Sequence, residues 1–406
     1  MIKRESYLEQ IRPFIDKPFI KVLTGIRRSG KSAVLMMIQE ELIDRGVDPG
    51  NIISINFESM IYSDLSDSRA LFDYIRAKIT DPGRKWYIFL DEIQEVLHWE
   101  KAVTSFLVDF DADLYITGSN SKLLSSELST YIAGRYIEIS VYPLSFREFL
   151  DFRAKRGIVP SENRQAEFVE FLRLGGFPAI HLAEYDYDAA YKIVNDIYAS
   201  AILRDSIQRF NIRNIELLER IVKYALDNVG NIFSAKKIAD YFKSQMRKAD
   251  LNTVYNYLQA LESAFIIQRV PRYDLKGHEI LKTNDKYFAG DPSIKYAVLG
   301  YRDRDISGNL ENIVYLELKR RGYKVYIGKL ADREVDFVAE KSNERIYVQV
   351  AYKLPSPETV AREYGPLKEI RDSYPKYVVT MEDFWQDNID GIKHRHIAEF
   401  LLQKDL

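Results

Sequence analysis

The sequence predicts an α/β protein built around a mostly parallel β-sheet, with helical regions and a second set of strands further along the chain. Short apolar runs alternate with helical stretches in the first 145 residues. The strands then stop, and from about residue 146 to 213 apolar residues recur at helical spacing. From residue 291 onward the pattern is a helix, three strands, a helix and a strand.

The composition excludes several classes of protein. Of 406 residues, 46% are hydrophobic and 29% charged, as in globular domains, and no run approaches the roughly 20 apolar residues that span a bilayer. We therefore expect several domains and no membrane partner. The absence of cysteine excludes disulfides, thiol catalysis and Cys-ligated zinc. The N-terminal stretch lacks the apolar core of a signal peptide, so we expect a cytoplasmic protein.

The first sheet is predicted from short runs rich in Ile, Val, Phe and Tyr. Such runs, separated by helices, are typical of buried parallel strands covered on both faces. The five expected strands are residues 19–24, 52–57, 86–90, 114–117 and 136–141.

A glycine-rich loop lies between the first strand and the helix after it. Residues 25–32, GIRRSGKS, match the G-x-x-x-x-G-K-[ST] pattern. Its glycines let backbone N–H groups close around phosphate oxygens, and the helix N-terminus adds partial positive charge. We expect Lys31 to bridge the β- and γ-phosphates of ATP and Ser32 to bind Mg²⁺. The residues expected to bind the nucleotide are Gly25, Ile26, Arg27, Arg28, Ser29, Gly30, Lys31, Ser32 and Ala33.

Two carboxylates follow the third strand, which places them at the carboxyl edge of the sheet beside this loop. We expect Asp91 to hold Mg²⁺ through its water shell, and Glu92 to orient and polarise the water that attacks the γ-phosphate. Together with the loop, this pair predicts an enzyme that hydrolyses ATP.

Two further residues are candidates for catalysis. Asn120 follows the fourth strand, where it could contact the γ-phosphate or the attacking water, and a plain turn residue is the alternative. Arg135 precedes the fifth strand and could stabilise transition-state charge, with a surface charge as the alternative. Action of Arg135 in a neighbouring subunit would require a homo-oligomer, and the sequence leaves that choice open.

Residues 215–290 have the pattern of a winged helix-turn-helix, with three helices followed by a hairpin. Thr253, Asn256 and Tyr257 lie near the start of the third helix, which commonly enters a DNA groove. Residues 231–286 hold ten Lys or Arg against six Asp or Glu, whereas the whole chain has a net charge of -2. DNA binding and protein docking therefore both stay open.

Several strings resemble a widespread bacterial and archaeal family of AAA-type predicted ATPases with a C-terminal domain of unknown function. They are GIRRSGKS, FLDEIQ, TGSNS, AGRY followed by VYPLSFREFL, and LGGFP. The resemblance covers essentially the whole chain and implies an ATP-hydrolysing, ASCE/AAA-like P-loop sheet. It also implies a winged helix and a terminal domain similar to the PD-(D/E)XK, or restriction-endonuclease-like, nucleases. The expected domains are a P-loop ATPase core (1–145), a helical subdomain (146–213), the winged helix (214–290) and the nuclease-like domain (291–406).

The nuclease-like domain departs from the family pattern at its expected metal site. An intact site would hold a helix glutamate, an aspartate and E-x-K. Here Glu311 or Glu317 can supply the first and Asp336 the second. The third strand instead has Gln349 and Ala351, which can neither hold a metal as carboxylate does nor activate water as lysine does.

Lys353 lies on the same strand face as Ala351, but roughly 7 Å further along, so we expect a non-cleaving domain. The resulting hypothesis is an ATPase that couples nucleotide state to DNA or DNA-associated partners. One alternative is a slow nucleotide-dependent switch that binds a protein partner without DNA. The other is an ATP-gated nuclease.

Overall fold

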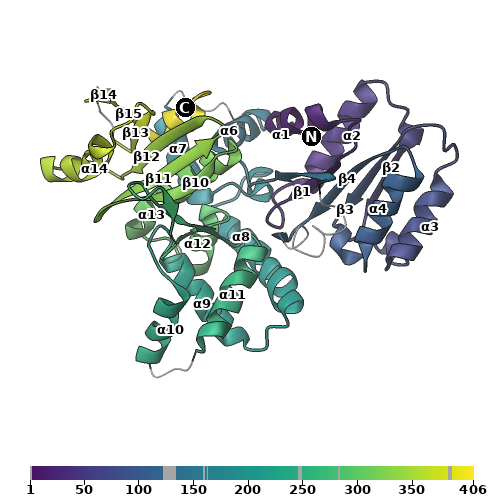
Figure 1. Ribbon diagram of the computed structural model, residues 1–406, viewed down its shortest axis with the longest axis horizontal. Helices are drawn as coiled ribbons and strands as arrows, with labels where there is room; N and C mark the ends of the chain where they lie inside the picture. The colour runs from purple at the N-terminus through teal and green to yellow at the C-terminus, as the bar shows by residue number, and fades with distance from the viewer. Residues whose placement is uncertain are drawn as a thin grey trace. The chain divides into compact units, whose positions relative to one another are not determined.

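The computed structural model describes residues 2–121, 134–158, 161, 163–245, 249–281, 284–382 and 386–406. The chain divides into two compact units, Met1–Val141 and Tyr142–Leu406. In Figure 1 the first unit is coloured from purple to blue and the second from teal to yellow. Within the described ranges, none of the helices has the length and apolar character needed to cross a bilayer.

The first unit contains one five-stranded sheet, and each of its ladders is parallel. Its strands are β1 (Ile20–Thr24), β2 (Ile52–Asn56), β3 (Trp86–Asp91), β4 (Ala112–Gly118) and β5 (Tyr136–Ser140). They lie in the order β2-β3-β4-β1-β5, so β4 separates the loop-bearing β1 from β3. Thr24 lies opposite Gly118 and Asn56 opposite Asp91, which aligns the carboxyl ends of four strands at one edge. The predicted parallel sheet is confirmed.

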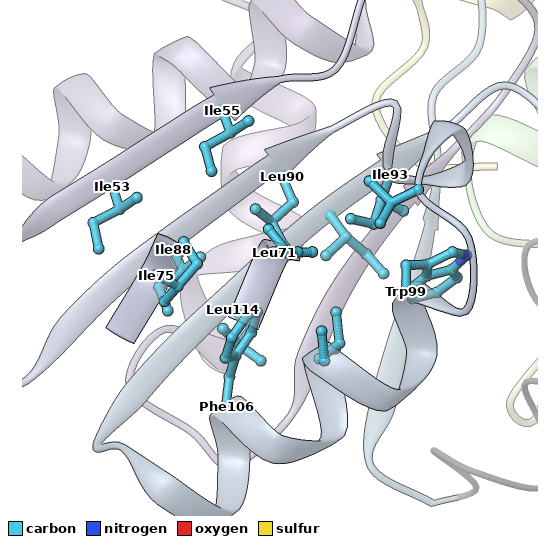
Figure 2. Close-up of a cluster of buried hydrophobic side chains, with 14 of the residues drawn as sticks. Ile53, Ile55, Leu71, Ile75, Ile88, Leu90, Ile93, Trp99, Phe106 and Leu114 are labelled. Carbon is cyan, nitrogen blue, oxygen red and sulfur yellow. The ribbon is translucent and has the colours of Figure 1, made fainter. Parts of the chain in front are cut away.

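Helices cover both faces of this sheet. Its helices are α1 (Glu5–Ile11), α2 (Lys31–Asp44), α3 (Ser68–Lys78) and α4 (Trp99–Asp109), with short 3₁₀ turns η1 (Arg12–Phe14), η2 (Pro49–Asn51), η3 (Met60–Tyr62) and η4 (Ile93–Glu95). Because strand side chains alternate between faces, Ile88 and Leu90 of β3 pack with α3 and α4, whereas Phe89 packs with α1 and α2. Figure 2 shows the first of these two cores. Coverage on both faces explains why every residue of β3 is buried.

Helices dominate the start of the second unit, as the spacing predicts. They are α6 (Phe146–Lys155), α7 (Arg164–Leu174), η6 (Pro178–His181), α8 (Tyr187–Ala201), the π-helical η7 (Ile202–Gln208), α9 (Ile215–Asp227), α10 (Ala235–Ser244) and α11 (Leu251–Ser263). The first of these begins at a capping box, in which Ser145 and Glu148 each accept the other's backbone N–H.

The predicted hairpin after α11 is present as two successive antiparallel ladders. β6 (Ile267–Val270) pairs with β9 (Lys286–Ala289), and β7 (Arg272–Asp274) pairs with β8 (Glu279–Ile280). In addition, β7 pairs in parallel with β10 (Lys324–Leu330). The outer half of the hairpin therefore belongs to the second sheet.

That second sheet has eight strands in the order β14-β15-β13-β12-β11-β10-β7-β8. Its remaining strands are β11 (Arg333–Lys341), β12 (Glu344–Val350), β13 (Lys376–Thr380), β14 (Asn388–Ile389) and β15 (Ile392–His396). The accompanying helices are α12 (Pro292–Leu299), η8 (Asp303–Asp305), α13 (Ile306–Arg320), α14 (Pro357–Glu369) and α15 (Ile397–Leu402). The predicted order of helix, three strands, helix and strand is confirmed by α13, β10, β11, β12, α14 and β13.

Candidate functional site

The loop between β1 and α2 has backbone angles that favour glycine. Gly25 has φ +148° and Gly30 has φ +101°. A Cβ atom on Gly25 would lie 2.2 Å from the carbonyl oxygen of Val141, so no side chain fits there. Gly30 is the N-cap of α2, and no side chain caps that helix within the described residues. The positive end of a 14-residue helix therefore faces the loop.

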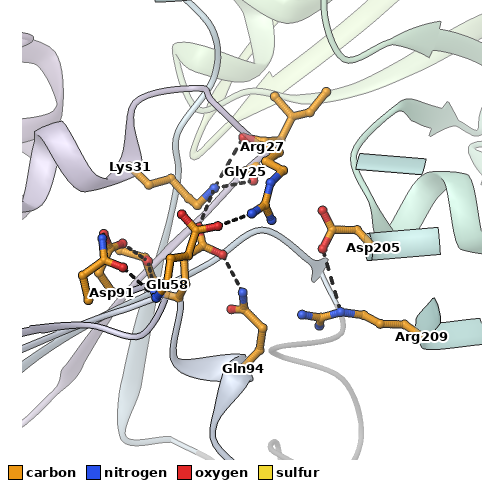
Figure 3. A network of polar contacts seen from close by, with 12 residues as sticks. Gly25, Arg27, Lys31, Glu58, Asp91, Gln94, Asp205 and Arg209 are labelled. Carbon is orange, nitrogen blue, oxygen red and sulfur yellow. Dashed lines mark hydrogen bonds and ion pairs between the residues drawn. The ribbon is translucent and has the colours of Figure 1, made fainter. Parts of the chain in front are cut away.

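The side chain of Lys31 turns back into this loop (Figure 3). Its Nζ donates to the carbonyls of Gly25 at 3.1 Å and Ile26 at 3.4 Å. The same atom lies 3.5 Å from Glu92 Oε1, and the lysine is buried. The Lys31 ammonium therefore lies between the loop carbonyls and the Glu92 carboxylate.

Asp91 lies at the end of β3, where three elements converge on its carboxylate. Thr117 Oγ1 of β4 donates to Oδ1 at 2.5 Å, and Asn56 Nδ2 of β2 donates to Oδ2 at 3.0 Å. The Ser32 hydroxyl lies near the same carboxylate. Burial raises the pKa of Asp91, although the hydroxyls of Ser32 and Thr117 oppose this shift. The structure therefore brings the two residues predicted to bind Mg²⁺ together.

Glu92 has the left-handed φ of +56°, which turns the chain sharply after β3. Its backbone N–H donates to Thr117 Oγ1 at 2.8 Å, and Gln94 Nε2 donates to its carboxylate. Burial alone would raise the pKa of Glu92, but Lys31, Gln94 and Arg27 together hold that pKa below its ordinary value. One threonine hydroxyl therefore orients both acidic residues.

The other loop residues differ in exposure. Ile26, Arg27 and Ser29 are buried, Arg28 and Ser32 are exposed, and Ala33 is half-buried at the start of α2. Arg27 forms an ion pair with Glu58, which follows β2. The Ser29 hydroxyl is buried and has no hydrogen-bond partner among the described residues. The loop therefore contains one buried polar group without a partner in this part of the chain.

The two further candidates lie at opposite edges of the sheet. Asn120 is fully buried, two residues beyond Gly118, at the edge that carries the loop. Arg135 is exposed and precedes β5, and its carbonyl accepts the N–H of Ile20 at the start of β1. That is the amino edge, roughly 15 Å along the strands from the loop. The structure does not bring Arg135 to the site of its own chain.

Three polar residues at this site were not identified from the sequence: Asn56, Gln94 and Thr117. Asn56 ends β2 and Thr117 lies one residue before the end of β4, so both are at strand ends next to Asp91. A polar side chain at the carboxyl end of each neighbouring strand is the signal that could have indicated them.

Comparisons with known proteins agree with this geometry. The model of an AAA domain matches residues 17–150, and that of a domain of unknown function, DUF8612, matches residues 165–305. An uncharacterized protein of Haemophilus influenzae is 39% identical over 405 residues, which are 99% of each chain. The chain belongs to a family of AAA-domain proteins. An uncharacterized protein of Methanocaldococcus jannaschii is 29% identical over 94% of this chain and 86% of its own.

A solved structure resembles this AAA-domain protein in fold. The Walker-type ATPase of Pyrococcus abyssi has a TM-score of 0.51 at 16% identity, covering 73% of this chain and 96% of its own. At that identity the likeness concerns the fold alone. The matched AAA domain contains the glycine loop, both acidic residues and Asn120.

The second unit of the AAA-domain protein contains a buried cluster around Lys286 of β9. Its Nζ lies 2.7 Å from Glu334 Oε1, 3.1 Å from Glu311 Oε2 and 3.6 Å from Asp336 Oδ1. Burial opposes a charge on Lys286, but the three carboxylates raise its pKa above the ordinary value. Burial raises the pKa of Glu311 and that of Asp336 above their ordinary values, although the charge of Lys286 opposes both shifts. A lysine thus occupies the space between these carboxylates.

Of the two helix glutamates expected near Asp336, Glu311 belongs to this cluster and Glu317 does not. Glu317 instead pairs with Arg320 and Arg321, each at 2.7 Å. Gln349 Nε2 donates to Glu363 Oε2 at 2.8 Å, so its amide is engaged within the domain. In the described residues, no group of three or more His, Asp or Glu side chains is arranged to hold a metal ion.

Of the three residues expected on the exposed face of helix α11, not all reach the surface. Asn256 is exposed and Thr253 half-buried, but Tyr257 is only 8% exposed. Tyr257 packs inside the helical core, because it follows Val254 by three residues on the apolar face. The prediction that Tyr257 faces a groove is wrong, and Tyr255 is the exposed aromatic residue on this helix.

Proposed function

We propose that this protein binds ATP with Mg²⁺ in the loop of residues 25–32 and hydrolyses it to ADP and phosphate. One observation carries the proposal: Lys31 of the loop and Glu92 after β3 meet at 3.5 Å, although 61 positions separate them in the sequence. An ammonium for phosphate and a carboxylate for water are the two groups that this reaction requires.

The loop residues fit a bound triphosphate. Gly25 leaves no room for a side chain, and the N-terminus of α2 supplies N–H donors and partial positive charge. The buried hydroxyl of Ser29 offers a further donor, since it has no partner among the described residues. The candidate ligands for the phosphates are therefore the backbone of residues 25–33 together with Lys31.

Ser32 and Asp91 fit Mg²⁺, because hydroxyl and carboxylate oxygens are the ligands this ion prefers. Bound there, the ion would neutralise charge on the phosphates. Thr117 and Asn56 would keep the Asp91 carboxylate in place from β4 and β2. Asn120, at the same edge, is proposed to contact the γ-phosphate or the water.

Glu92 is proposed to accept a hydrogen bond from the attacking water. Gln94 holds one of its oxygens, and Gln94 and Arg27 lower its pKa independently of Lys31. When Lys31 turns from the loop carbonyls and Glu92 to the phosphates, the other oxygen becomes available. If Arg135 takes part, it must do so in a neighbouring copy, because it lies at the opposite edge of its own sheet.

The remaining chain is proposed to be the output part of the molecule, with a helical subdomain (146–213), a winged helix (214–290) and a nuclease-like domain (291–406). We propose that it couples nucleotide state to DNA through the exposed side of α11. The alternative is a slow switch that holds a protein partner. One observation favours it: β7 pairs with β10, so this part of the hairpin belongs to the second sheet and is not a separate wing.

The nuclease-like domain is proposed not to cleave nucleic acid. Lys286 already occupies the space between Glu311, Glu334 and Asp336, and Gln349 is hydrogen-bonded to Glu363. Incubation of the protein with DNA, ATP and Mg²⁺ or Mn²⁺ is expected to leave the DNA intact. Cutting by the parental protein that disappears in Asp336→Ala would instead establish the ATP-gated nuclease.

The central test is steady-state ATP hydrolysis with and without double- and single-stranded DNA, using Lys31→Ala and Glu92→Gln as controls. Stimulation of several-fold by DNA, lost in both variants, is the expected result. Hydrolysis that depends on Lys31 but ignores DNA would favour the protein-binding switch. Equal phosphate release by the parental protein and both variants would refute the ATPase site itself.

A further inference from the structure

Arg4 lies outside every motif of the sequence, yet it contacts the phosphate loop. It precedes α1 and is only 2% exposed, although arginine is almost never fully buried without a partner. Its Nη1 donates to the carbonyl oxygen of Ser29 at 2.8 Å. The residue therefore connects the first helix to the loop that starts α2, which lies beside α1 in Figure 1.

Other contacts fix the position of this guanidinium. It lies over the ring of Tyr7, 4.6 Å from its centre, and Nη2 reaches the Tyr7 hydroxyl at 3.4 Å. The backbone N–H of Arg4 contacts Met37 Sδ of α2 at 3.4 Å. Tyr7 is fully buried, so the platform under the guanidinium is rigid.

The bond to Ser29 has a consequence for the next residue. In a trans peptide the C=O of one residue and the N–H of the next point in opposite directions. When Arg4 holds the Ser29 carbonyl, the N–H of Gly30 must point away from Arg4. Gly30 has φ +101° and no side chain to restrict it, so without this hydrogen bond the peptide could rotate easily.

We propose that Arg4 is a positioning residue of the phosphate loop, which fixes the Ser29–Gly30 peptide so that its N–H faces the phosphates. The inference rests on the proposed ATP site and assigns no contact between Arg4 and the nucleotide. This positioning effect would favour a bound anion, and it leaves the chemistry to Lys31 and Glu92.

The test compares Arg4→Met with Lys3→Met, a neighbouring change of the same charge at an exposed position. Titration calorimetry measures the Kd for ADP and for a non-hydrolysable ATP analogue, each with Mg²⁺. We expect the Kd to rise about tenfold in Arg4→Met, the effect of losing one hydrogen bond to a charged donor, and to stay unchanged in Lys3→Met. Arg4→Lys, which keeps the charge but not the fork of donors, is expected to raise it about threefold.

Kinetics separate positioning from a general loss of structure. A loop that is merely less ordered by Arg4→Met binds more weakly, so the KM for ATP should rise about tenfold while kcat changes less than threefold. A variant that is partly unfolded would instead lose kcat in proportion to the missing protein and keep its KM. If Arg4→Met does not fold, Arg4→Lys provides the same comparison.

A second measurement observes the loop itself. Hydrogen exchange of a peptide covering residues 25–33, in the absence of nucleotide, should be faster in Arg4→Met than in Lys3→Met. Parental Kd values in Arg4→Met and Arg4→Lys would overturn the inference while leaving the ATP site intact. Failure of the ATP site is a different result, because the parental protein would then bind no nucleotide.

Discussion

The ammonium of Lys31 lies 3.5 Å from the carboxylate of Glu92, and each group compensates the charge of the other in a buried setting. In the proposed ATPase mechanism, a phosphate that takes Lys31 away would also release Glu92. Nucleotide binding and activation of the water would then be linked through this one ion pair, and the first prediction separates them.

Glu92→Gln should retain nucleotide binding and lose hydrolysis. The amide keeps the size of the side chain but is a weak acceptor for the water proton, and such groups contribute roughly 10²- to 10⁴-fold. We expect hydrolysis to fall at least about 100-fold and the Kd for ATP to change less than about threefold. Glu95→Gln, an exposed neighbour, is the control for charge and should hydrolyse ATP normally. A Glu92→Gln variant with parental turnover would remove Glu92 from the mechanism.

Thr117→Val should impair the site without changing either acidic residue. Valine has the same shape but cannot donate to Asp91 or accept the N–H of Glu92. Small displacements of reacting groups are costly, so we expect hydrolysis to fall roughly 10- to 100-fold. The matched control is Thr104→Val, which removes a hydroxyl bonded within α4. Equal rates in the two variants would mean that Thr117 orients nothing.

Lys21 and Asp113 should contribute to stability as a pair. They form a fully buried ion pair near the amino edge of the first sheet, where Asp113 also accepts from Tyr115 and from the Asp16 N–H. Lys21→Met leaves a buried carboxylate without its cation, so we expect the free energy of unfolding to fall by about 3 to 5 kcal/mol. The double variant Lys21→Met/Asp113→Asn removes the buried charge but keeps an acceptor for Tyr115 and Asp16, so it should recover most of this loss in denaturant unfolding. A double variant no more stable than Lys21→Met would show that the unpaired charge of Asp113 is not the cause of the loss.

His181 should make the second unit sensitive to acid. It is buried against Phe149, and burial lowers its pKa to about 4, whereas an unfolded histidine has a pKa near 6.5. Between these values the unfolded chain binds the extra proton. Stability is therefore complete above pH 6.5 and falls as the pH drops toward 4, by roughly 3 kcal/mol in all.

The measurement is urea unfolding between pH 7 and 4.5 in the parental protein and in His181→Gln, which keeps a donor for the Gly175 carbonyl. The variant should lose part of the pH dependence. If the free energy of unfolding changes with pH equally in both proteins, the acid sensitivity belongs to other groups, such as His394, whose pKa is also lowered by burial.

The parts of the fold that the sequence predicts are those with local signals. The glycine loop, the acidic pair after a buried strand and the order of elements from α13 to β13 each depend on neighbours in the chain. The continuous apolar run of β3 likewise predicts its burial on two faces. These signals are sufficient to predict that Lys31, Ser32, Asp91 and Glu92 lie close together.

Contacts that depend on strand order could not be predicted in the same way. Thr117 reaches Asp91 only because β4 lies next to β3, and the roles of Asn56 and Arg4 depend on similar long-range packing. Lys286 meets Glu311 and Asp336 from a hairpin that the sequence assigns to another domain. The same limit applies to Arg135, whose distance from the loop follows from the register of β5 on β1.

The pairing of β7 with β10 gives the second unit a mechanical property. Backbone hydrogen bonds run without interruption from β8 through β7, β10, β11 and β12 to β13. A displacement of the hairpin after α11 would therefore pull directly on the strands that carry Asp336 and Gln349, rather than be absorbed by bending near residue 290. If the proposed output part binds a partner, the hairpin and the terminal sheet would therefore move together.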